Sequence, residues 1–450
     1  MPDPAPALLT GWGRTAPTLA TVVRPTSVAA AAAAVASAGG RGSLARGLGR
    51  SYGDAAQNAG GQVLDLTLLD RVLELDDVDG TVTAEAGLSL DALLRYLLPR
   101  GWFVPVTPGT RYVTLGGALA VDVHGKNHHR DGSIASHVTS FDLLLADGSV
   151  RQVTPQDDPD LFWATAGGMG LTGIVVSLTL RLVPVTSAWM LVDTVRAPDL
   201  DALLAGLVEG DQVSRYSVAW IDCLAGGRHQ GRGVITRGDH APADAVPGSG
   251  DPLAYRPNPR ITVPPHLPGG LLNPLSVRAF NEAWYRKAPR HRVAEPQRLS
   301  TFFHPLDGVQ QWNRAYGPRG FLQYQLVVPT DRDDALRAAL ELLRRSGAPS
   351  FLAVLKRFGP ADPGPLSFPR PGWTLALDVT ASAADLADLL DALDRLVVDA
   401  GGAVYLAKDS RLRPELLPRM YPDLDAFRTV RQRVDPTGRF TSDLARRLDL

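Results

Sequence analysis

The fold is decided by a glycine-rich stretch near the amino terminus, Ala45-Arg46-Gly47-Leu48-Gly49-Arg50-Ser51-Tyr52-Gly53-Asp54. Three glycines fall within seven residues of it, and glycine permits the positive φ angles with which successive backbone N–H groups form an anion-binding nest. The spacing Gly-x-Gly-x-x-x-Gly is one residue longer than the dinucleotide fingerprint, and no strongly apolar strand leads into it. The stretch predicts a phosphate-binding loop outside a Rossmann fold. An ordinary glycine-rich turn is the alternative.

A second glycine-rich segment runs from Pro108 to Ala118 and continues into Val121–His129. Two such loops flanked by short strands suit a long cofactor with two phosphates better than a lone turn does. Between the two loops, the segment Ser89–Leu98 predicts a helix with its leucines on one face. After the second loop, Gly167–Gly173 introduces a predicted strand that reaches Leu182. The first half of the chain therefore belongs to the α+β class.

Length and charge limit the possible functions. The chain has 450 residues, which favours two domains. Its net charge of −1 provides no general field for nucleic acid or anionic lipid, although a local basic patch stays possible. A single cysteine, Cys223, excludes an internal disulfide and a multi-cysteine metal site, and we expect it to be buried. Neither Met1–Pro6 nor the alanine run Val28–Ala36 reads as a signal peptide or a membrane span, so any membrane contact would be peripheral.

The second half alternates strands and helices, which predicts an antiparallel sheet backed by helices. The predicted strands are Phe321–Val328, Phe351–Lys356 and Trp373–Val379, and the predicted helices are Asp333–Arg345 and Ala384–Val398. A proline-rich interruption, Pro242–Pro268, predicts a long surface loop and a candidate lid.

The motifs of the chain, taken in order, are Gly47–Asp54, Pro108–Gly117, His124–His129, Gly170–Gly173, Trp312–Pro318, Phe321–Gln325 and Ala407–Arg411. Together they resemble the decaprenylphosphoryl-β-D-ribose 2′-oxidases, flavoenzymes of the vanillyl-alcohol-oxidase superfamily found in mycobacteria and related actinobacteria. The resemblance covers nearly the whole chain. It implies an α+β, two-domain fold of the vanillyl-alcohol-oxidase type, with an FAD-binding domain at residues 1–186 and 402–450 and a substrate-binding domain at residues 187–401.

The resemblance also implies where FAD binds. The loop Ala45–Asp54 would hold the pyrophosphate and adenosine, and the other implied contacts are Gly109, Thr114, Gly116, Gly117, Val121, His124, Val175 and Tyr405. Many relatives attach FAD covalently through a histidine in the position before the serine of this loop. That position is Arg50 here, so we expect non-covalent FAD.

Oxidation of a secondary alcohol by flavin requires hydride transfer from the carbinol carbon and removal of the hydroxyl proton. Lys408 is the catalytic candidate, either stabilising a developing alkoxide or accepting the proton if burial lowers its pKa. The substrate-binding candidates carried by the resemblance are Tyr52, His124, Lys126, Trp220, Gln323, Gln325, Lys356 and Phe358.

Each candidate has a simpler alternative. Without the resemblance, Lys408 would be a surface lysine after a strand, Trp220 a core residue, and Gln323 with Gln325 the polar face of a sheet. His124, His128 and His129 also invite a zinc interpretation, but the glutamate of a zincin motif is missing, so we predict no metal.

Three positions depart from the mycobacterial pattern. Phe303 replaces a tyrosine, Thr374 an asparagine and Ala376 a cysteine. None is the presumed hydride or proton partner, so we expect catalysis to survive while the hydrogen bonding of the sugar changes. We also expect no reactive thiol in the active site.

The predicted function is oxidation of a polyprenyl-phospho-ribose to its 2′-keto sugar, which a separate reductase would convert into the arabinose donor for cell-wall arabinan. We expect peripheral contact with the cytoplasmic membrane and no nucleic-acid partner. The rivals are a soluble sugar or alditol oxidase of the same superfamily, which would commonly carry the linking histidine, and a catalytically silent polyprenyl-phosphate carrier, which would lose Lys408 or the glycine loop.

Overall fold

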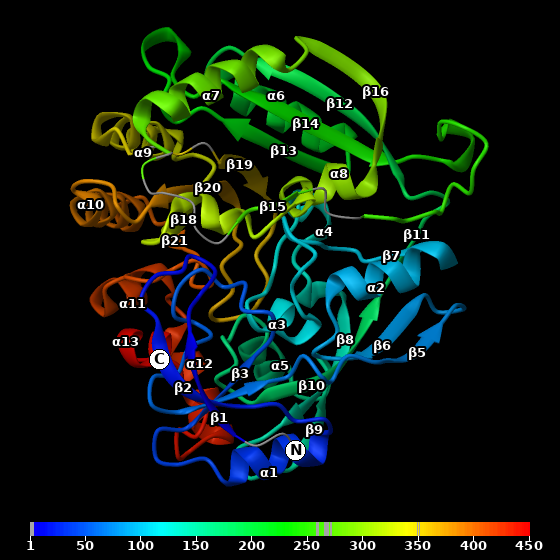
Figure 1. Cartoon of the computed structure of the whole chain (residues 1–450), viewed down its shortest axis with the longest axis vertical. Coiled ribbons are helices and arrows are strands. Elements are labelled where there is room, and N and C mark those ends of the chain that lie inside the picture. Colours follow the sequence, from blue (N-terminus) through cyan, green and yellow to red (C-terminus); the bar gives the residue numbers. More distant parts are fainter. Residues whose placement is uncertain (1–3, 258–260, 265–269, 271, 349, 351) are drawn as a thin grey trace.

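The computed structural model describes residues 4–257, 261–264, 270, 272–348, 350 and 352–450. The two ends of the chain lie together in the lower half of Figure 1, and the middle of the chain forms the upper half. Contacts between distant segments hold the lower half together, since Thr18 Oγ1 donates to Asp443 Oδ2 at 3.2 Å and Ser43 bridges to Phe440. The structure combines helices and sheets in two halves, in agreement with the predicted α+β, two-domain fold.

One mixed sheet and one antiparallel sheet build the lower half. The first sheet has the order β1 (Ala5–Leu9), β2 (Thr18–Val23), β4 (Gln62–Asp65), β3 (Ser43–Arg46). The second sheet has the order β5 (Val72–Asp76), β6 (Thr81–Glu85), β10 (Ile174–Arg181), β8 (Val138–Leu144), β9 (Val150–Val153). Strand β3 leads directly into the glycine-rich loop, so this loop starts at the end of a strand.

Short helices pack around these sheets. They are α1 (Val28–Ala36), α2 (Leu90–Leu97), α3 (Leu115–Ala120), α5 (Pro159–Thr165), α11 (Leu417–Met420), α12 (Leu424–Val434) and α13 (Asp443–Leu448). Helix α4 (His128–Asp131) instead contacts strand β19 (Ala353–Phe358) of the upper half. The helix predicted at residues 89–98 is confirmed as α2. The side chain of Ser89 caps it by accepting from Ala92 N, and its leucines are buried because they recur at helical spacing.

The upper half contains one large antiparallel sheet. Its order is β16 (His291–Arg298), β12 (Trp189–Ala197), β14 (Gly233–His240), β13 (Tyr216–Ile221), β19 (Ala353–Phe358), β20 (Gly372–Thr380), β18 (Phe321–Val328), β21 (Ala403–Val404). Helices α6 (Leu200–Val213), α9 (Asp333–Ser346) and α10 (Leu386–Asp399) pack against this sheet, which confirms the predicted sheet backed by helices. The strand predicted from Phe351 begins at Ala353, and Phe351 itself lies outside the described residues.

The predicted loop Pro242–Pro268 is only partly a loop. Ile261–Thr262 form strand β15, which pairs in parallel with β17 (Val309–Gln310). The loop is also tied to the body, because Ala188 N donates to Pro252 O at 2.8 Å and Arg111 donates to Pro257 O at 2.7 Å. Residues 258–260 and 265–268 of the predicted loop lie outside the described residues.

The remaining elements are short or peripheral to the sheets. They are β7 (Trp102–Phe103), which pairs with β11 (Val183–Pro184), and the helices α7 (Pro274–Lys287) and α8 (Leu299–Phe303). Within the described ranges, no helix combines the length and the apolar character needed to cross a membrane.

Candidate active site

One face of the large sheet collects most of the predicted substrate residues. Residues directly opposite one another in paired strands point to the same face. Gln325 lies opposite Ala376, Gln323 opposite Asp378, and Lys356 opposite Thr374. We call this surface the site face, and its members are Trp220, Gln323, Gln325, Lys356, Phe358, Thr374, Ala376 and Asp378. The alternate residues, such as Leu326, Leu375 and Leu377, are buried in the core.

His124 lies against the site face. Gln325 Nε2 is 2.9 Å from His124 Nε2 and donates at 3.2 Å to Thr374 Oγ1. The imidazole also contacts the rings of Phe358 and Tyr405, with centroids 4.8 and 5.2 Å away. Burial lowers the pKa of His124 well below its ordinary value, and the charge of Lys356 lowers it further. The ring is therefore neutral, and its buried Nδ1 finds no hydrogen-bond partner in the described part of the chain.

The other two histidines of this segment make separate contacts. His128 Nδ1 accepts from Gly359 N at 3.1 Å, and His129 Nδ1 lies 3.5 Å from Asp211 Oδ1. The residues that the structure describes contain no group of three or more His, Cys, Asp or Glu side chains arranged to hold a metal ion.

A short carboxy-terminal segment joins the sheet to the glycine-rich loop. Tyr405 N donates to Gln325 O at 2.9 Å, and its hydroxyl donates to Val121 O at 2.7 Å. Tyr52 N donates to Ala407 O at 3.0 Å. Segment 405–409 therefore places Lys408 between the site face and the loop.

Three of the four lysines of the chain meet here, all half-buried. Lys408 Nζ lies 3.9 Å from the ring centroid of Tyr52. Lys126 Nζ donates to Phe302 O and lies 4.2 Å from the centroid of that ring, and Lys356 Nζ donates to Gly125 O at 3.5 Å. Burial lowers the pKa of Lys126 to about 7 and that of Lys356 to about 8.

Asp378 is a site residue that our sequence analysis missed. It is fully buried on the site face and accepts hydrogen bonds from Gln323 Nε2 and, at 3.1 Å, from the hydroxyl of Tyr316. Burial raises its pKa, whereas burial lowers the pKa of Lys408 and the charge of Asp378 partly opposes that fall. A lone acid in the apolar strand Trp373–Val379 was the signal, because buried carboxylates require partners.

The geometry of the glycine-rich loop fits an anionic ligand. The backbone N–H groups of Leu48–Ser51 meet no acceptor within the described ranges. Glycine is required at Gly47, where a Cβ would lie 2.1 Å from Thr114 Oγ1, and at Gly53, where it would lie 1.9 Å from Asp409 O. Gly49 has a φ of +63°, as a backbone nest requires. The loop therefore suits the pyrophosphate of FAD.

The side chains of this loop have different surroundings. Arg46 donates to Ala56 O at 2.6 Å and to Thr10 O at 2.7 Å, and Asp54 pairs with Arg447 at 2.8 Å. These two side chains hold the loop in place. Arg46 and Asp54 would therefore contact a cofactor through their backbone atoms. Arg50 instead stacks on Trp12, with its guanidinium carbon 3.7 Å from the ring centroid, and its buried Nε has no partner in the described chain.

The remaining predicted residues are more dispersed. Thr114 caps α3 by accepting from Gly117 N at 3.3 Å, and a Cβ on Gly116 would lie 2.8 Å from the Cβ of Ala86. Gly109 is exposed at the surface of its loop. Val175 is on β10 and packs into the core of the lower half.

The departure residues and Cys223 also have defined surroundings. Phe303 is buried between Tyr216 and Phe302, with ring centroids 4.8 and 5.0 Å away, while Thr374 and Ala376 lie on the site face. Cys223 is buried, as predicted, and burial raises the pKa of its thiol.

The sequence is similar to those of known proteins. Residues 19–154 match the family model described as FAD binding domain, and residues 332–448 match D-arabinono-1,4-lactone oxidase. The chain is 46% identical to the decaprenylphosphoryl-β-D-ribose oxidase of Mycolicibacterium smegmatis, over 98% of this chain and 97% of the relative. An uncharacterized protein of Streptomyces coelicolor is 45% identical over 81% of this chain and 100% of the relative. The L-gulono-1,4-lactone dehydrogenase of Mycobacterium tuberculosis is 27% identical over 95% of both chains. The chain is an FAD-dependent oxidoreductase and belongs to the decaprenylphosphoryl-β-D-ribose oxidase family.

Proposed function

We propose that this oxidoreductase converts the 2′-hydroxyl of a polyprenylphosphoryl-β-D-ribose into the 2′-keto sugar. This is the first half of an epimerisation that leads to an arabinose donor. The observation that carries the proposal is the concentration of three half-buried lysines around a sheet face with two glutamines. Such a face offers cations for a phosphate and amides for sugar hydroxyls. The name of the Mycolicibacterium relative supports this substrate.

The site residues have two roles, which are proton transfer and positioning of the substrate. Bound FAD supplies the hydride acceptor. Lys408 accepts the hydroxyl proton at Nζ, because burial lowers its pKa and favours the neutral amine. Gln323 and Gln325 orient the sugar hydroxyls, while Lys126 and Lys356 attract the phosphate or a flavin carbonyl.

The remaining substrate candidates surround these groups. Tyr52, His124, Trp220 and Phe358 would form the walls of the sugar site. The unpartnered Nδ1 of His124 is then available as a hydrogen-bond donor to the substrate or to the flavin.

We further propose that FAD is held without a covalent bond. Arg50 occupies the linking position, and its guanidinium stacks on Trp12. The loop Ala45–Asp54 would hold the pyrophosphate through its backbone, assisted by Gly109, Thr114, Gly116 and Gly117, with Val121, Val175 and Tyr405 around the flavin.

The domain division proposed is an FAD-binding domain of residues 1–186 and 402–450 and a substrate-binding domain of residues 187–401. The sheets support it, because β1–β6 and β8–β10 lie in the first segment and β12–β20 contribute to the sheets of the middle segment. Strand β21 is shared, since Ala403–Val404 add an edge to the large sheet. The proposed partners are a separate keto-sugar reductase and, through peripheral contact, the cytoplasmic membrane.

One experiment separates this function from its nearest rival. The match to a D-arabinono-1,4-lactone oxidase model favours, as second candidate, a soluble sugar or alditol oxidase. We would mix the holoenzyme anaerobically with a detergent-dispersed polyprenyl-phospho-ribose and follow the flavin absorbance. Bleaching by the lipid and not by free alditols or sugar lactones is expected. Bleaching by the free sugars alone would overturn the substrate assignment, and no bleaching by any of them would favour a silent carrier.

A further inference from the structure

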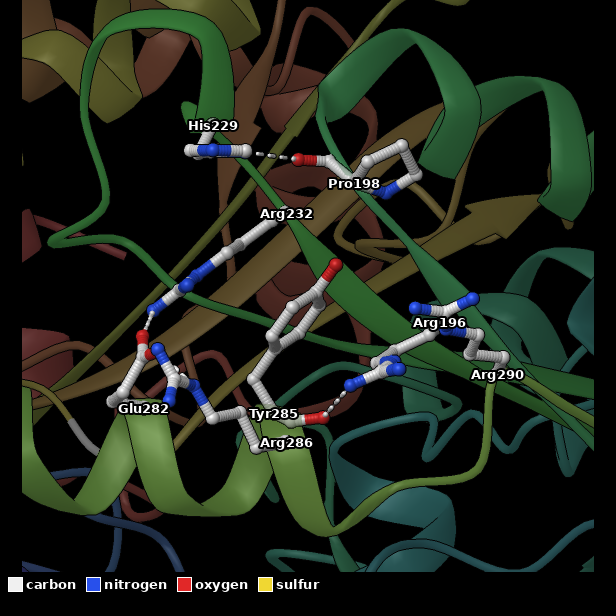
Figure 2. Close-up of a pocket in the computed structure, with 8 residues that line it drawn as sticks. All are labelled: Arg196, Pro198, His229, Arg232, Glu282, Tyr285, Arg286 and Arg290. Atoms are coloured by element: carbon white, nitrogen blue, oxygen red, sulfur yellow. Dashed lines mark hydrogen bonds and ion pairs between the residues drawn. The ribbon is translucent and has the colours of Figure 1, made fainter.

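An arginine-rich cavity lies between helix α7 and three strands of the large sheet. It has a volume of about 690 Å³, and Figure 2 shows its lining side chains around Tyr285. Four arginines reach it from separate segments: Arg196 is on β12, Arg232 immediately precedes β14, Arg286 is on α7, and Arg290 immediately precedes β16. Four segments of the chain therefore converge on one basic cavity.

Two of these arginines are neutralised by carboxylates. Glu282 pairs with Arg232 at 2.6 Å and with Arg286 at 2.5 Å, and Asp222 also pairs with Arg232 at 2.9 Å. Figure 2 shows Arg232, Glu282 and Arg286 on one side of the Tyr285 ring. The charges on this side of the cavity therefore balance, with two guanidinium groups against two carboxylates.

Arg196 and Arg290 lie on the other side of that ring (Figure 2) and face each other across two strands. Val195 pairs with His291 in the register of β12 and β16, and Arg196 N donates to Arg290 O at 3.1 Å, so the two arginines are directly opposite. Within the described ranges, neither guanidinium pairs with a carboxylate. Like charges directly opposite each other in an antiparallel pair are destabilising. This side of the cavity therefore carries two positive charges in excess.

The carboxy-terminal end of α7 does not cancel this excess. The last carbonyls of a helix carry partial negative charge, which disfavours a nearby anion. Here Trp284 O accepts from Ala288 N at 3.3 Å, and Tyr285 O accepts from Arg196 Nη1 at 3.5 Å. The last turn also contains Lys287 as well as an arginine. The carbonyls at this helix end are therefore partnered, and the excess of positive charge remains.

The cavity opens on the same face of the large sheet as the active site. Arg196 is opposite Val234 on β14, and Val234 is opposite Trp220 on β13, which belongs to the site face. Strands β14 and β13 separate β12 from β19, the strand that carries Lys356. Three inter-strand spacings amount to about 14 Å. An anion in the cavity would therefore be separate from the phosphate proposed beside Lys356.

We propose that Arg196 and Arg290 form a second anion site, which binds a phosphate dianion, either free or as the terminal group of an organic monoester. Two excess guanidinium groups match the two negative charges, and their forks of N–H donors match the phosphate oxygens. The cavity volume is within the roughly 300–1,000 Å³ of small-molecule sites, so an organic group fits beside Tyr285 and Pro198. The site goes beyond the proposed function and does not depend on the sugar substrate.

Titration calorimetry tests the proposal on the FAD-loaded enzyme. Inorganic phosphate and glycerol 3-phosphate are titrated separately, in chloride buffer at constant ionic strength. The variants are Arg290→Gln and Arg290→Lys. The matched control is Arg298→Gln, because Arg298 is an exposed arginine on the same strand that stacks on Trp189 and is not among the lining residues. Flavin content verifies folding, and Arg196→Gln replaces Arg290→Gln if that variant loses FAD.

The unaltered enzyme should bind at least one of the two probes. Loss of one guanidinium should weaken this binding by about tenfold or more in Arg290→Gln, while the control stays unchanged. Arg290→Lys should bind more tightly than Arg290→Gln, because it keeps the charge and loses only the fork of donors. Tighter binding of glycerol 3-phosphate would identify an organic monoester as the ligand, and equal or tighter binding of inorganic phosphate would identify the free ion. No binding of either probe, or equal binding by Arg290→Gln, would overturn the proposal.

Thermal melting provides a second readout with an opposite sign. Without phosphate, Arg290→Gln should melt at no lower temperature than the unaltered enzyme, because the repulsion between the facing arginines is gone. Added phosphate should raise the melting temperature of the unaltered enzyme more than that of the variant. A variant that melts lower without phosphate would show that the protein itself neutralises Arg290, and would contradict the proposal. Failure of polyprenyl-phospho-ribose to reduce the flavin counts against the proposed function and not against this anion site.

Discussion

Replacing Asp378 with asparagine removes the carboxylate beside Lys408 and keeps the shape of the side chain. Asparagine still accepts from the hydroxyl of Tyr316, and rotation of the Gln323 amide restores the second hydrogen bond. What changes is the charge. A neighbouring opposite charge shifts a pKa by about 1–3 units, or about 1.4–4 kcal/mol. The variant should therefore lower the pKa of the Lys408 ammonium by about that amount.

The direction of the pH effect follows from the role of Lys408. The neutral amine accepts the hydroxyl proton, so the rate of flavin reduction rises with pH through the pKa of Lys408. Without Asp378 the ammonium is less stable, and the rising limb moves to lower pH by about 1–3 units. At pH values below the original limb the variant should therefore reduce its flavin faster than the unaltered enzyme.

The assay is anaerobic stopped-flow bleaching of the flavin at saturating substrate, measured from acidic to alkaline pH. The matched control is Asp394→Asn. Asp394 is also buried and accepts from a tyrosine, Tyr324, at 2.9 Å, but it pairs with Arg411 at 2.7 Å. The control should lose stability and keep its pH limb. An unshifted limb in the Asp378 variant, or one displaced to higher pH, would refute the coupling. A rate that falls with pH in the unaltered enzyme would mean that Lys408 acts as a cation.

Four other outcomes are expected. Lys408→Ala should retain FAD while the rate of flavin reduction falls by about 10²–10⁴-fold; an undiminished rate would remove Lys408 from the mechanism. Acid precipitation of the holoenzyme should release the flavin into the supernatant, because Arg50 stands in the position of the linking histidine. Flavin that stays with the precipitated protein would contradict this. Gly47→Ala should weaken FAD binding, since the new Cβ would lie 2.1 Å from Thr114 Oγ1, and equilibrium dialysis of the flavin measures it. A thiol reagent should leave flavin reduction unchanged, because Cys223, the single cysteine of the chain, is buried. Covalent labelling at the flavin pocket would contradict this prediction.

Much of the fold was accessible from sequence because local patterns and tertiary structure agree. The spacing of the leucines predicted the helix α2, and the alternation of side chains predicted the strand β18. Both predictions are confirmed. The period of two also placed Gln323 and Gln325 on the same side of one strand, as their partners on β20 confirm. Asp378 could have been found by the same argument, since it lies on the matching face of β20.

Other features depend on partners that no local pattern reveals. The side chain of Asp54 pairs with Arg447, which lies 393 positions later in the chain. Arg46 bonds to the carbonyl of Thr10, on a different segment. Strand β15 also escaped prediction, because two residues in a proline-rich segment become a strand only when β17 lies beside them. The partial burial of the three lysines likewise results from the assembled structure, since lysine is ordinarily an exposed residue.

The segment 405–409 has a consequence for biosynthesis. It ties the early glycine-rich loop to a strand of the large sheet, through Tyr52 N to Ala407 O and Tyr405 N to Gln325 O. During translation, the loop is made first and its closing segment more than 350 residues later. The nascent chain therefore cannot complete the cofactor site until residues 405–409 have left the ribosome. Uptake of FAD into the completed site therefore follows the synthesis of residue 409.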